Sequence, residues 1–201
     1  MENDPKKPER DWDSYYRQRA PGEIPWYFDD LDPDLDMVLA NRKLKSGKFL
    51  DLGSGPGTQA SQLAKRGFEA IGCDISQTAV DQAKTRFPEV SFVRDDILKS
   101  NLPSFTFDFV FDRGCFHVFS PEHVESYLFH VANVLKVGGL LFLKCFSQDE
   151  LGKHQGPRRF SHAEIYEIFD SKFNIESLVD TTYQGTLSIP PKALFVVMMK
   201  K

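Results

Sequence analysis

Glycine recurs at every second position directly after an apolar segment of the sequence. Residues 49–52 lead into Gly53, Gly55 and Gly57, and Pro56 stands before the last of these glycines. Glycine lets the backbone turn sharply and approach a ligand closely. The spacing differs from the G-x-G-x-x-G fingerprint of dinucleotide sites, in which a helix N-terminus faces a pyrophosphate. The loop therefore predicts close contact with a ligand rather than a phosphate site.

Carboxylates follow the next two predicted strands at positions that suit a nucleoside. Asp74 ends an apolar segment beyond Gly57, where it can accept hydrogen bonds from both ribose hydroxyls. NAD sites share this acid, so it indicates a ribose rather than the cofactor that carries it. After the third strand, Asp95 and Asp96 offer a carboxylate for an adenine amino group, and Ile97 offers an apolar contact for the ring. The spacing predicts a nucleoside-binding site.

The fourth predicted strand ends in Asp-Arg-Gly-Cys-Phe-His at positions 112–117, and open α/β sheets place their chemistry at the carboxyl ends of strands. His117 is the best candidate for a general base by its pKa class; a hydrogen-bonded histidine at the start of a loop is the alternative. Asp112 is a second candidate for catalysis and also for cofactor binding. The predicted lining of the substrate mouth or lid is Trp26, Arg113, Cys115 and Arg159. Cys115 is more consistent with a small buried residue than with a nucleophile, and an exposed, solvated charge is the alternative for Arg159.

Apolar segments alternate with amphipathic segments from Lys48 onward, which is typical of a parallel sheet covered by helices on both faces. Strands are predicted at 49–52, 70–73, 90–93, 107–111 and 140–145, and helices at 58–65, 77–85 and from Pro121 to the Gly138–Gly139 pair. A capping box at Ser161 and Glu164 predicts a later helix. Two strand-like stretches, 173–182 and 193–199, then follow without a helix between them, so they must pair as a hairpin or as an adjacent antiparallel edge. The expected fold class is a doubly wound α/β sheet of seven strands, mostly parallel, with one antiparallel strand near the C-terminus.

An extension rich in aromatic residues precedes this pattern. Asp32 and Pro33 start a predicted helix, and the aromatic residues before it are Trp12, Tyr15, Tyr16, Trp26, Tyr27 and Phe28. Such residues either attach an extension to the core or form a lid over an active site. We expect residues 1–201 to form a single domain, in which 1–32 is an N-terminal extension or lid.

Composition narrows the classes of partner. A formal net charge of -4 argues against nucleic-acid binding, which depends on clustered lysine and arginine. Three widely separated cysteines indicate a reduced, intracellular protein that needs neither disulfides nor a metal. The N-terminus is polar, and no apolar segment approaches the length of a membrane span. We expect a cytoplasmic monomer or homodimer with a small-molecule substrate, no nucleic-acid partner and no membrane contact.

Residues 48–145 resemble the class I S-adenosylmethionine-dependent methyltransferases. Leu-Asp-Leu-Gly-Ser-Gly-Pro-Gly at 50–57 is similar to the first motif of that family, Gly-Cys-Asp-Ile-Ser at 72–76 to the second, and Arg-Asp-Asp-Ile at 94–97 to the third. The resemblance implies a Rossmann-like fold, S-adenosylmethionine as cofactor and S-adenosylhomocysteine as product.

The same likeness assigns roles to individual residues. It implies that Asp51 lies near the methionine amino group, that Gly53 and Gly55 lie against the methionine and ribose, and that Asp74 binds the ribose and Asp96 the adenine. The full set of cofactor-binding candidates is Asp51, Gly53, Gly55, Gly57, Asp74, Ile75, Asp95, Asp96, Ile97 and Asp112.

Asp112-Arg113-Gly114, together with Pro25-Trp26, resembles the small-molecule branch that includes thiopurine, thiol and halide-type methyltransferases. This resemblance implies in-line transfer of a methyl group to a small, soft nucleophile such as a thiol. One alternative is methylation of a protein or other macromolecule. Another is that this chain is a partner protein that binds S-adenosylmethionine without catalysing a reaction. An NAD(P)-dependent oxidoreductase is less favoured, because Thr58 rather than glycine occupies the sixth position of the loop.

Overall fold

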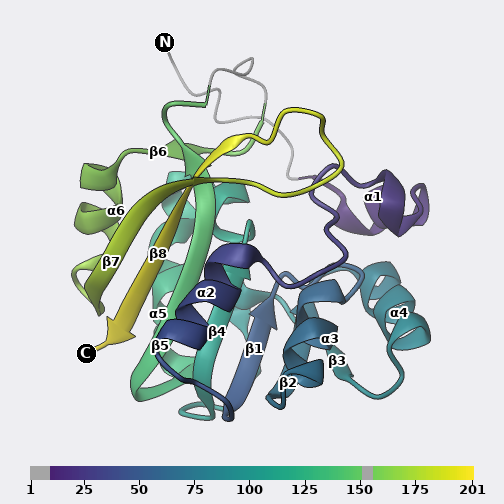
Figure 1. The fold of residues 1–201 in the computed structure, drawn as a ribbon, viewed down its shortest axis with the longest axis horizontal. Coiled ribbons are helices and arrows are strands. Elements are labelled where there is room, and N and C mark those ends of the chain that lie inside the picture. The colour runs from purple at the N-terminus through teal and green to yellow at the C-terminus, as the bar shows by residue number, and fades with distance from the viewer. Residues whose placement is uncertain (1–9, 151–155) are drawn as a thin grey trace.

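The computed structural model describes residues 10–150 and 156–201, which form a twisted sheet with helices around it (Figure 1). The sheet has eight strands in the order β3-β2-β1-β4-β5-β8-β7, with β6 beside β5. They are β1 (Lys48–Leu52), β2 (Glu69–Asp74), β3 (Ser91–Arg94), β4 (Phe107–Arg113), β5 (Leu135–Ser147), β6 (Arg159–Phe160), β7 (Phe173–Thr182) and β8 (Lys192–Lys200). The predicted count of seven is wrong by one, because β6 is a two-residue strand and is too short to show a hydrophobic pattern.

Strand direction follows the sequence prediction. The strands β1 to β5 pair in parallel, and β8 runs antiparallel to both of its neighbours, β5 and β7. The chain enters β8 directly from β7 without a helix, so the two must be antiparallel. The strand order reverses between β1 and β4, and ligands bind at such a switch point in open α/β sheets.

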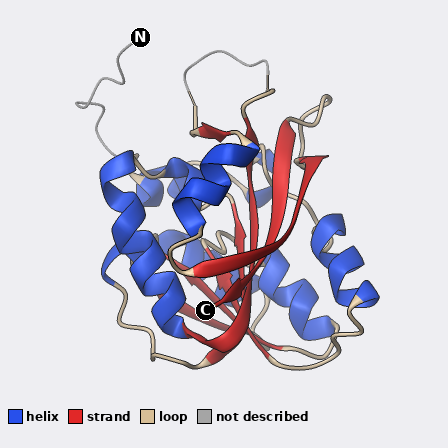
Figure 2. Cartoon of the chain, turned by 90° about the vertical axis from the view of Figure 1, so that its left-hand side faces the viewer, coloured by secondary structure: helices blue, strands red, loops and turns tan. Residues whose placement is uncertain are grey.

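Helices cover both faces of the sheet (Figure 2). They are α1 (Trp12–Arg17), α2 (Pro33–Asn41), α3 (Thr58–Lys65), α4 (Gln77–Arg86), α5 (Val124–Val134) and α6 (His162–Phe169). The capping box predicted for α6 is present, because Ser161 Oγ accepts from the Glu164 N–H and the Glu164 carboxylate accepts from the Ser161 N–H. None of the helices in the described ranges is long and apolar enough to cross a membrane.

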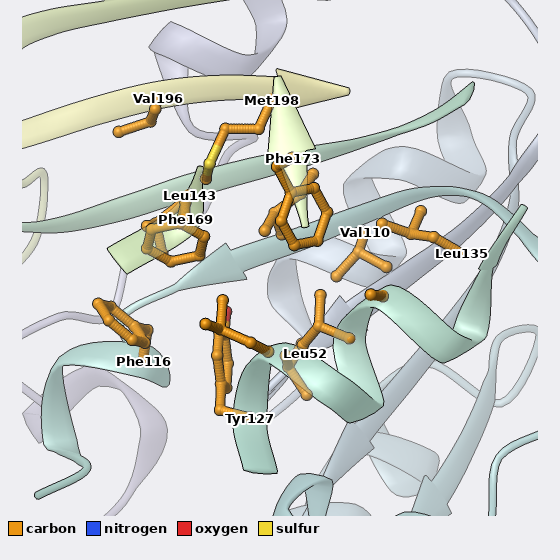
Figure 3. Packing of buried hydrophobic residues seen from close by; sticks show 14 of the residues in the cluster. Leu52, Val110, Phe116, Tyr127, Leu135, Leu143, Phe169, Phe173, Val196 and Met198 are labelled. Carbon is orange, nitrogen blue, oxygen red and sulfur yellow. The ribbon is translucent and has the colours of Figure 1, made fainter. Parts of the chain in front are cut away.

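The two faces of the sheet bury separate hydrophobic clusters. Leu52 on β1 packs with Tyr127 of α5 and Phe169 of α6 on one face, and Figure 3 shows this cluster. Phe49 on the same strand packs against Leu63 of α3 on the other face. Successive side chains of a strand point to opposite faces, so β1 is buried on both sides. This rigid centre fixes the position of the loop that follows β1.

The element between β4 and β5 differs from its prediction. The expected helix from Pro121 to the glycine pair instead ends at Val134, and β5 already begins at Leu135. Pairing with β4 shifts register in this region, and a Cβ on Gly139 would lie 2.9 Å from the Lys136 carbonyl oxygen. The glycine pair therefore marks a strand irregularity, at which glycine is common, rather than the end of a helix.

Candidate functional site

The glycine loop after β1 passes close to two other parts of the chain. Gly53 and Gly55 have φ angles of 69° and 49°, in the left-handed region that favours glycine. A Cβ on Gly53 would lie 2.9 Å from Cys115 Cβ, and one on Gly55 would lie 2.9 Å from the Tyr16 hydroxyl oxygen. A side chain is therefore excluded at both positions by other parts of the chain, and the predicted contact of this backbone with a ligand stays a prediction.

Gly57 has a different reason to be glycine. Its φ is 84° at the start of α3, and a Cβ there would lie 2.7 Å from the Phe92 ring and 2.8 Å from Ala83 Cβ. Gly57 does not line the cavity described below. The prediction that it binds the cofactor does not fit this placement, because packing of α3 against β3 and α4 accounts for the residue.

A cavity of about 490 Å³ lies at the carboxyl ends of the central strands, within the range typical of small-molecule sites. It adjoins a cavity of about 40 Å³ that contains Asp51 and Gly55 and shares Trp26, Gly53 and Arg113 with the larger one. The other predicted residues that line the larger cavity are Asp74, Ile75, Asp95, Asp96, Ile97, Cys115 and His117. Apart from Trp26, the predicted residues therefore come from the ends of four strands, β1 to β4, and meet at one place, as the topology requires.

Two buried carboxylates hold the glycine loop and the helix α3 that follows it. Asp74 accepts a hydrogen bond from the Gly55 N–H at 2.9 Å and another from the Ser76 N–H at 2.9 Å. Asp51 accepts from the Ala60 N–H at 2.9 Å. Burial raises the pKa of Asp74 to about 6 and the pKa of Asp51 to about 7, because a low-dielectric site disfavours the charged form. Donors or a cation placed here would favour the ionised carboxylates.

The two acids after β3, Asp95 and Asp96, differ in the hydrogen bonds that their carboxylate oxygens accept. Asp96 Oδ1 accepts from the Leu98 N–H at 3.1 Å and so caps the short turn Ile97–Lys99. Asp95 Oδ1 accepts from the Asn101 N–H at 3.0 Å, whereas its Oδ2 is buried without a hydrogen-bond partner among the residues that the structure describes. Buried polar atoms are normally paired, so this oxygen can receive a donor from a ligand.

Asp112 lies beneath the site rather than in it. Its Oδ1 accepts from the N–H groups of Gly114 and Cys115, and its Oδ2 accepts from the Phe116 N–H and the Tyr127 hydroxyl, at 2.7–3.0 Å. The residue is fully buried and does not line either cavity. The predictions of catalysis and cofactor binding by Asp112 are therefore corrected: it is a positioning residue, because its four bonds shape the turn that presents Cys115 and His117.

His117 borders the large cavity, but its environment does not suit a general base. Its Nδ1 accepts from the Phe146 N–H at 3.3 Å, and its ring stacks on the Phe146 ring with centroids 4.7 Å apart. Burial lowers the pKa of His117 to about 3. A group that ionises so far below neutral pH is a weak proton acceptor. The structure favours the alternative, a hydrogen-bonded histidine at the start of a loop.

The N-terminal segment forms a wall of the cavity. Asp13 in α1 accepts from the Ser76 Oγ–H and from the Thr78 N–H, each at 2.9 Å, and so attaches α1 to the start of α4. Trp26 stacks on Tyr15 with ring centroids 5.3 Å apart, and both line the cavity. The sequence pattern left open whether these aromatic residues attach the segment or cover a site. The structure shows that they attach the segment and line the cavity, and a lid stays a prediction.

Arg113 joins this wall to the sheet. Its guanidinium donates to Asp32 Oδ2 at 2.7 Å, to the Trp26 carbonyl oxygen at 2.9 Å and to the Gln184 carbonyl oxygen at 2.6 Å. Lys144 on β5 binds the same buried carboxylate and donates to both oxygens of Asp32. Arg113 lines both cavities, and its three hydrogen bonds within the chain hold Trp26 in place. Its predicted role at the substrate mouth or lid stays a prediction.

Other residues were misplaced or missed by the sequence. Arg159 lies on β6 opposite Phe146 and is not among the residues that line the cavity, so its predicted place at the substrate mouth is wrong. The residues that sequence reasoning missed include Arg10, Phe119, Phe146, Pro157, Tyr183 and Leu187, which also line the cavity. They come from segments distant in sequence, and the dense aromatic content was the available signal.

The comparisons with known proteins agree with this geometry. A protein-family model described as a methyltransferase domain matches residues 49–139 of the sequence. An uncharacterised methyltransferase of Schizosaccharomyces pombe is 31% identical over 121 residues, which are 57% of this chain and 83% of that protein. A probable thiol methyltransferase of Arabidopsis thaliana is 28% identical over 79% of this chain and 73% of that protein.

Protein methyltransferases and solved structures also match. The human eEF1A lysine and N-terminal methyltransferase is 29% identical over 64% of this chain and 20% of that protein. A protein solved in a study of the conversion of a disulfide bond into a thioacetal group during echinomycin biosynthesis has a TM-score of 0.82 at 21% identity, over 94% of this chain and 92% of the other. Fold, glycine loop and relatives agree, and the chain belongs to the class I methyltransferases that use S-adenosylmethionine as cofactor.

Proposed function

We propose that this protein transfers a methyl group from S-adenosylmethionine to a small-molecule nucleophile, with a thiol as the first candidate. The observation that carries the proposal is the lining of the cavity, which combines the acids at the end of β2 and after β3 with aromatic side chains of the N-terminal segment and with Tyr183 of the β7–β8 connection. Trp26 lines this cavity, and a site that it covers would suit a small acceptor, whereas a polymer needs an open trough. Residues 10–32 are proposed to act as a lid of this single domain, and residues 1–9 of the predicted extension lie outside the described residues.

The residues present fit the cofactor. Asp74, at the end of β2, is proposed to accept from the ribose hydroxyls, and Asp51, in the small adjoining cavity, to face the amino group. The unpaired Asp95 Oδ2 is an acceptor for the adenine amino group, while Asp96 and Ile97 complete that end of the cavity. When bound, the cofactor supplies a methyl group on a positively charged sulfur.

The task of the chain is alignment and exclusion of water. In-line displacement requires the acceptor atom to be held about 3 Å from the methyl carbon and opposite the leaving sulfur. The aromatic wall of Tyr15, Tyr16 and Trp26, fixed through Arg113 and Asp13, is suited to shielding that position from solvent. We propose no covalent intermediate, and Cys115, whose pKa is raised by burial, is assigned to the lining.

Methylation of a protein is the second candidate function, because a protein methyltransferase is among the relatives. Cofactor binding without catalysis is the third. Membership of the methyltransferase family removes the oxidoreductase alternative. The three remaining candidates share the cofactor and differ in the acceptor, so they are separated by what is methylated.

Isothermal titration with S-adenosylhomocysteine is expected to show binding, and a panel of thiols, amines and carboxylates is expected to give methylated thiols by mass spectrometry. A lack of binding at millimolar ligand would refute the proposed site. Binding with transfer to a protein extract but to no small molecule would favour the second candidate, and binding with no methylated product would favour the third.

The affinity for S-adenosylhomocysteine is expected to rise about tenfold or more between pH 5.5 and pH 8, because the pKa of Asp51 is about 7 and that of Asp74 about 6 in the free protein. Ligand donors favour the ionised carboxylates, so binding is weak below these pKa values and strong above them. Titration at several pH values measures the effect. Adenosine, which lacks the amino acid part and so its α-amino group, is the control, and its affinity should rise less with pH. An equal or opposite pH dependence for adenosine would refute the role of Asp51.

A further inference from the structure

Aromatic and aliphatic side chains surround His117 at the end of the cavity away from the nucleoside-binding acids. The ring stacks on Phe146 and lies 5.9 Å from the Tyr183 ring, centroid to centroid. Val118, Phe119, Pro157, Leu187 and Pro191 line the same cavity. An acceptor that enters this end leaves water and meets an apolar surface, so any polar contact made there has a large influence on its orientation.

The backbone fixes which nitrogen of His117 carries the proton. The Phe146 N–H donates to Nδ1 at 3.3 Å, so Nδ1 must be the acceptor and the neutral ring carries its hydrogen on Nε2. No hydrogen bond links Nε2 to any residue within 10–150 and 156–201. The N–H of Nε2 is therefore available as a donor to a molecule in the cavity.

The charged and titratable groups around this ring are already engaged. Tyr183 donates its hydroxyl to the Lys144 carbonyl oxygen at 2.7 Å. Arg158 donates its backbone N–H to the His117 carbonyl oxygen at 2.7 Å and directs its guanidinium toward the Phe119 carbonyl oxygen. Arg113 and Asp112 have the bonds described above, and burial raises the pKa of both Cys115 and Tyr183. None of these groups is suited to remove a proton from an acceptor near neutral pH.

We infer that His117 is a hydrogen-bond donor that orients an anionic acceptor atom, and that the acceptors of this site are apolar small molecules whose nucleophile is already ionised near neutral pH, such as aromatic thiols. This inference rests on the proposed function. The lone pair of the thiolate forms the new bond to the methyl carbon, while the carbon–sulfur bond of the donor breaks and its electron pair stays on the sulfur. The products are two neutral thioethers, so no proton has to leave and no base is needed.

The arrangement also predicts what is rejected. A protonated amine would place its own donors against the N–H of Nε2, so neither group would find an acceptor in the apolar surroundings, which is unfavourable. An aliphatic thiol with a pKa near that of cysteine, about 8.5, is mostly protonated at pH 7. Selectivity thus follows the acidity of the acceptor as well as its shape.

Long-range proton–nitrogen NMR of the histidine rings tests the His117 assignment without turnover. The expected result is a neutral ring protonated on Nε2 from pH 6 to pH 8, with His117→Gln identifying the signal. Titration of His117 within that range, or a proton on Nδ1, would overturn the inference.

Kinetic pH profiles test the acceptor class. With S-adenosylmethionine saturating at every pH, we expect kcat/KM for 4-nitrobenzenethiol, benzenethiol and 2-mercaptoethanol to rise with pH up to the pKa of each thiol and then to level off. An inflection near pH 6–7 that is shared by all three thiols and lost in His117→Gln would identify His117 as a base and refute the inference.

Two variants separate donation from packing. His117→Gln keeps a donor, whereas His117→Phe keeps an aromatic ring but has no N–H. We expect His117→Phe to lower kcat/KM for thiolates about tenfold or more, as for loss of a hydrogen bond to a charged group, and His117→Gln to retain most of it. Equal values for both variants and the wild type would contradict donation by His117. Cofactor binding without methylation of any thiol would instead refute the proposed function, while the NMR result would still report on the ring.

Discussion

Replacement of Lys144 by methionine is expected to lower the free energy of unfolding by about 3–5 kcal/mol, the range observed when one partner of a buried ion pair is removed. The Lys144 Nζ lies within 2.7–2.9 Å of both Asp32 oxygens, of Asp34 Oδ2 and of Gln184 Oε1. Lys144 and Asp32 are both fully buried. Methionine fills a similar volume but leaves Asp32 with one cationic partner, Arg113, where it had two.

Urea denaturation at equilibrium measures this effect, and Lys136→Met is the matched control. Lys136 pairs with Asp108 at 2.7 Å, but both side chains are partly exposed, at 48% and 33%. Exposed pairs contribute about 0–1 kcal/mol, so the control is expected to unfold close to the wild type. A loss below about 1 kcal/mol for Lys144→Met would show that the buried pair is not important for stability.

The position of this ion pair explains its relevance to the site. Asp32 starts α2, Lys144 lies near the end of β5, and Gln184 lies in the β7–β8 connection. Arg113 joins the same carboxylate to the Trp26 backbone. The group therefore connects the Trp26 backbone, the sheet and the β7–β8 connection, and we expect damage to it to disturb the lining of the cavity as well as the fold.

Sequence patterns were sufficient for the frame of the fold. Buried strands such as β1 appear as short apolar segments, and the absence of a helix between β7 and β8 requires an antiparallel pair. The Gly-x-Gly spacing and Asp74 follow from the same logic, because they end consecutive strands and must lie at one edge of the sheet. These signals are local, and each is complete within a few residues.

The rest depends on contacts between distant segments. Lys144 stands inside the apolar segment 140–145, and nothing in that segment reveals the Asp32 carboxylate that neutralises it. The roles of Asp112 and His117 were assigned by residue type and strand position, whereas their neighbours decide them: four donors for Asp112, and the Phe146 N–H for His117. The two-residue β6 has no pattern of its own.

Replacement of Asp74 by alanine is expected to weaken binding of S-adenosylhomocysteine by about 1.5–3 kcal/mol or more, which is about 10-fold to 150-fold in Kd. The reason is the loss of the proposed charge-assisted bonds from two ribose hydroxyls to the Asp74 carboxylate. The variant also removes the acceptor for the Gly55 N–H, so the glycine loop loses a contact that sets its shape. Both effects act in the same direction.

Calorimetric titration at pH 8 measures this loss, and Asp81→Ala is the matched control, because Asp81 is an exposed carboxylate on the neighbouring helix α4. Thermal unfolding of each variant separates a lost ligand contact from a damaged fold. The part of the pH dependence that comes from Asp74 should disappear in Asp74→Ala, while the part near pH 7 assigned to Asp51 should remain. Unchanged affinity in a folded Asp74→Ala protein would show that the ribose does not bind at the end of β2. The carboxylates after β3 would then be the acids in the larger cavity that could bind the ribose.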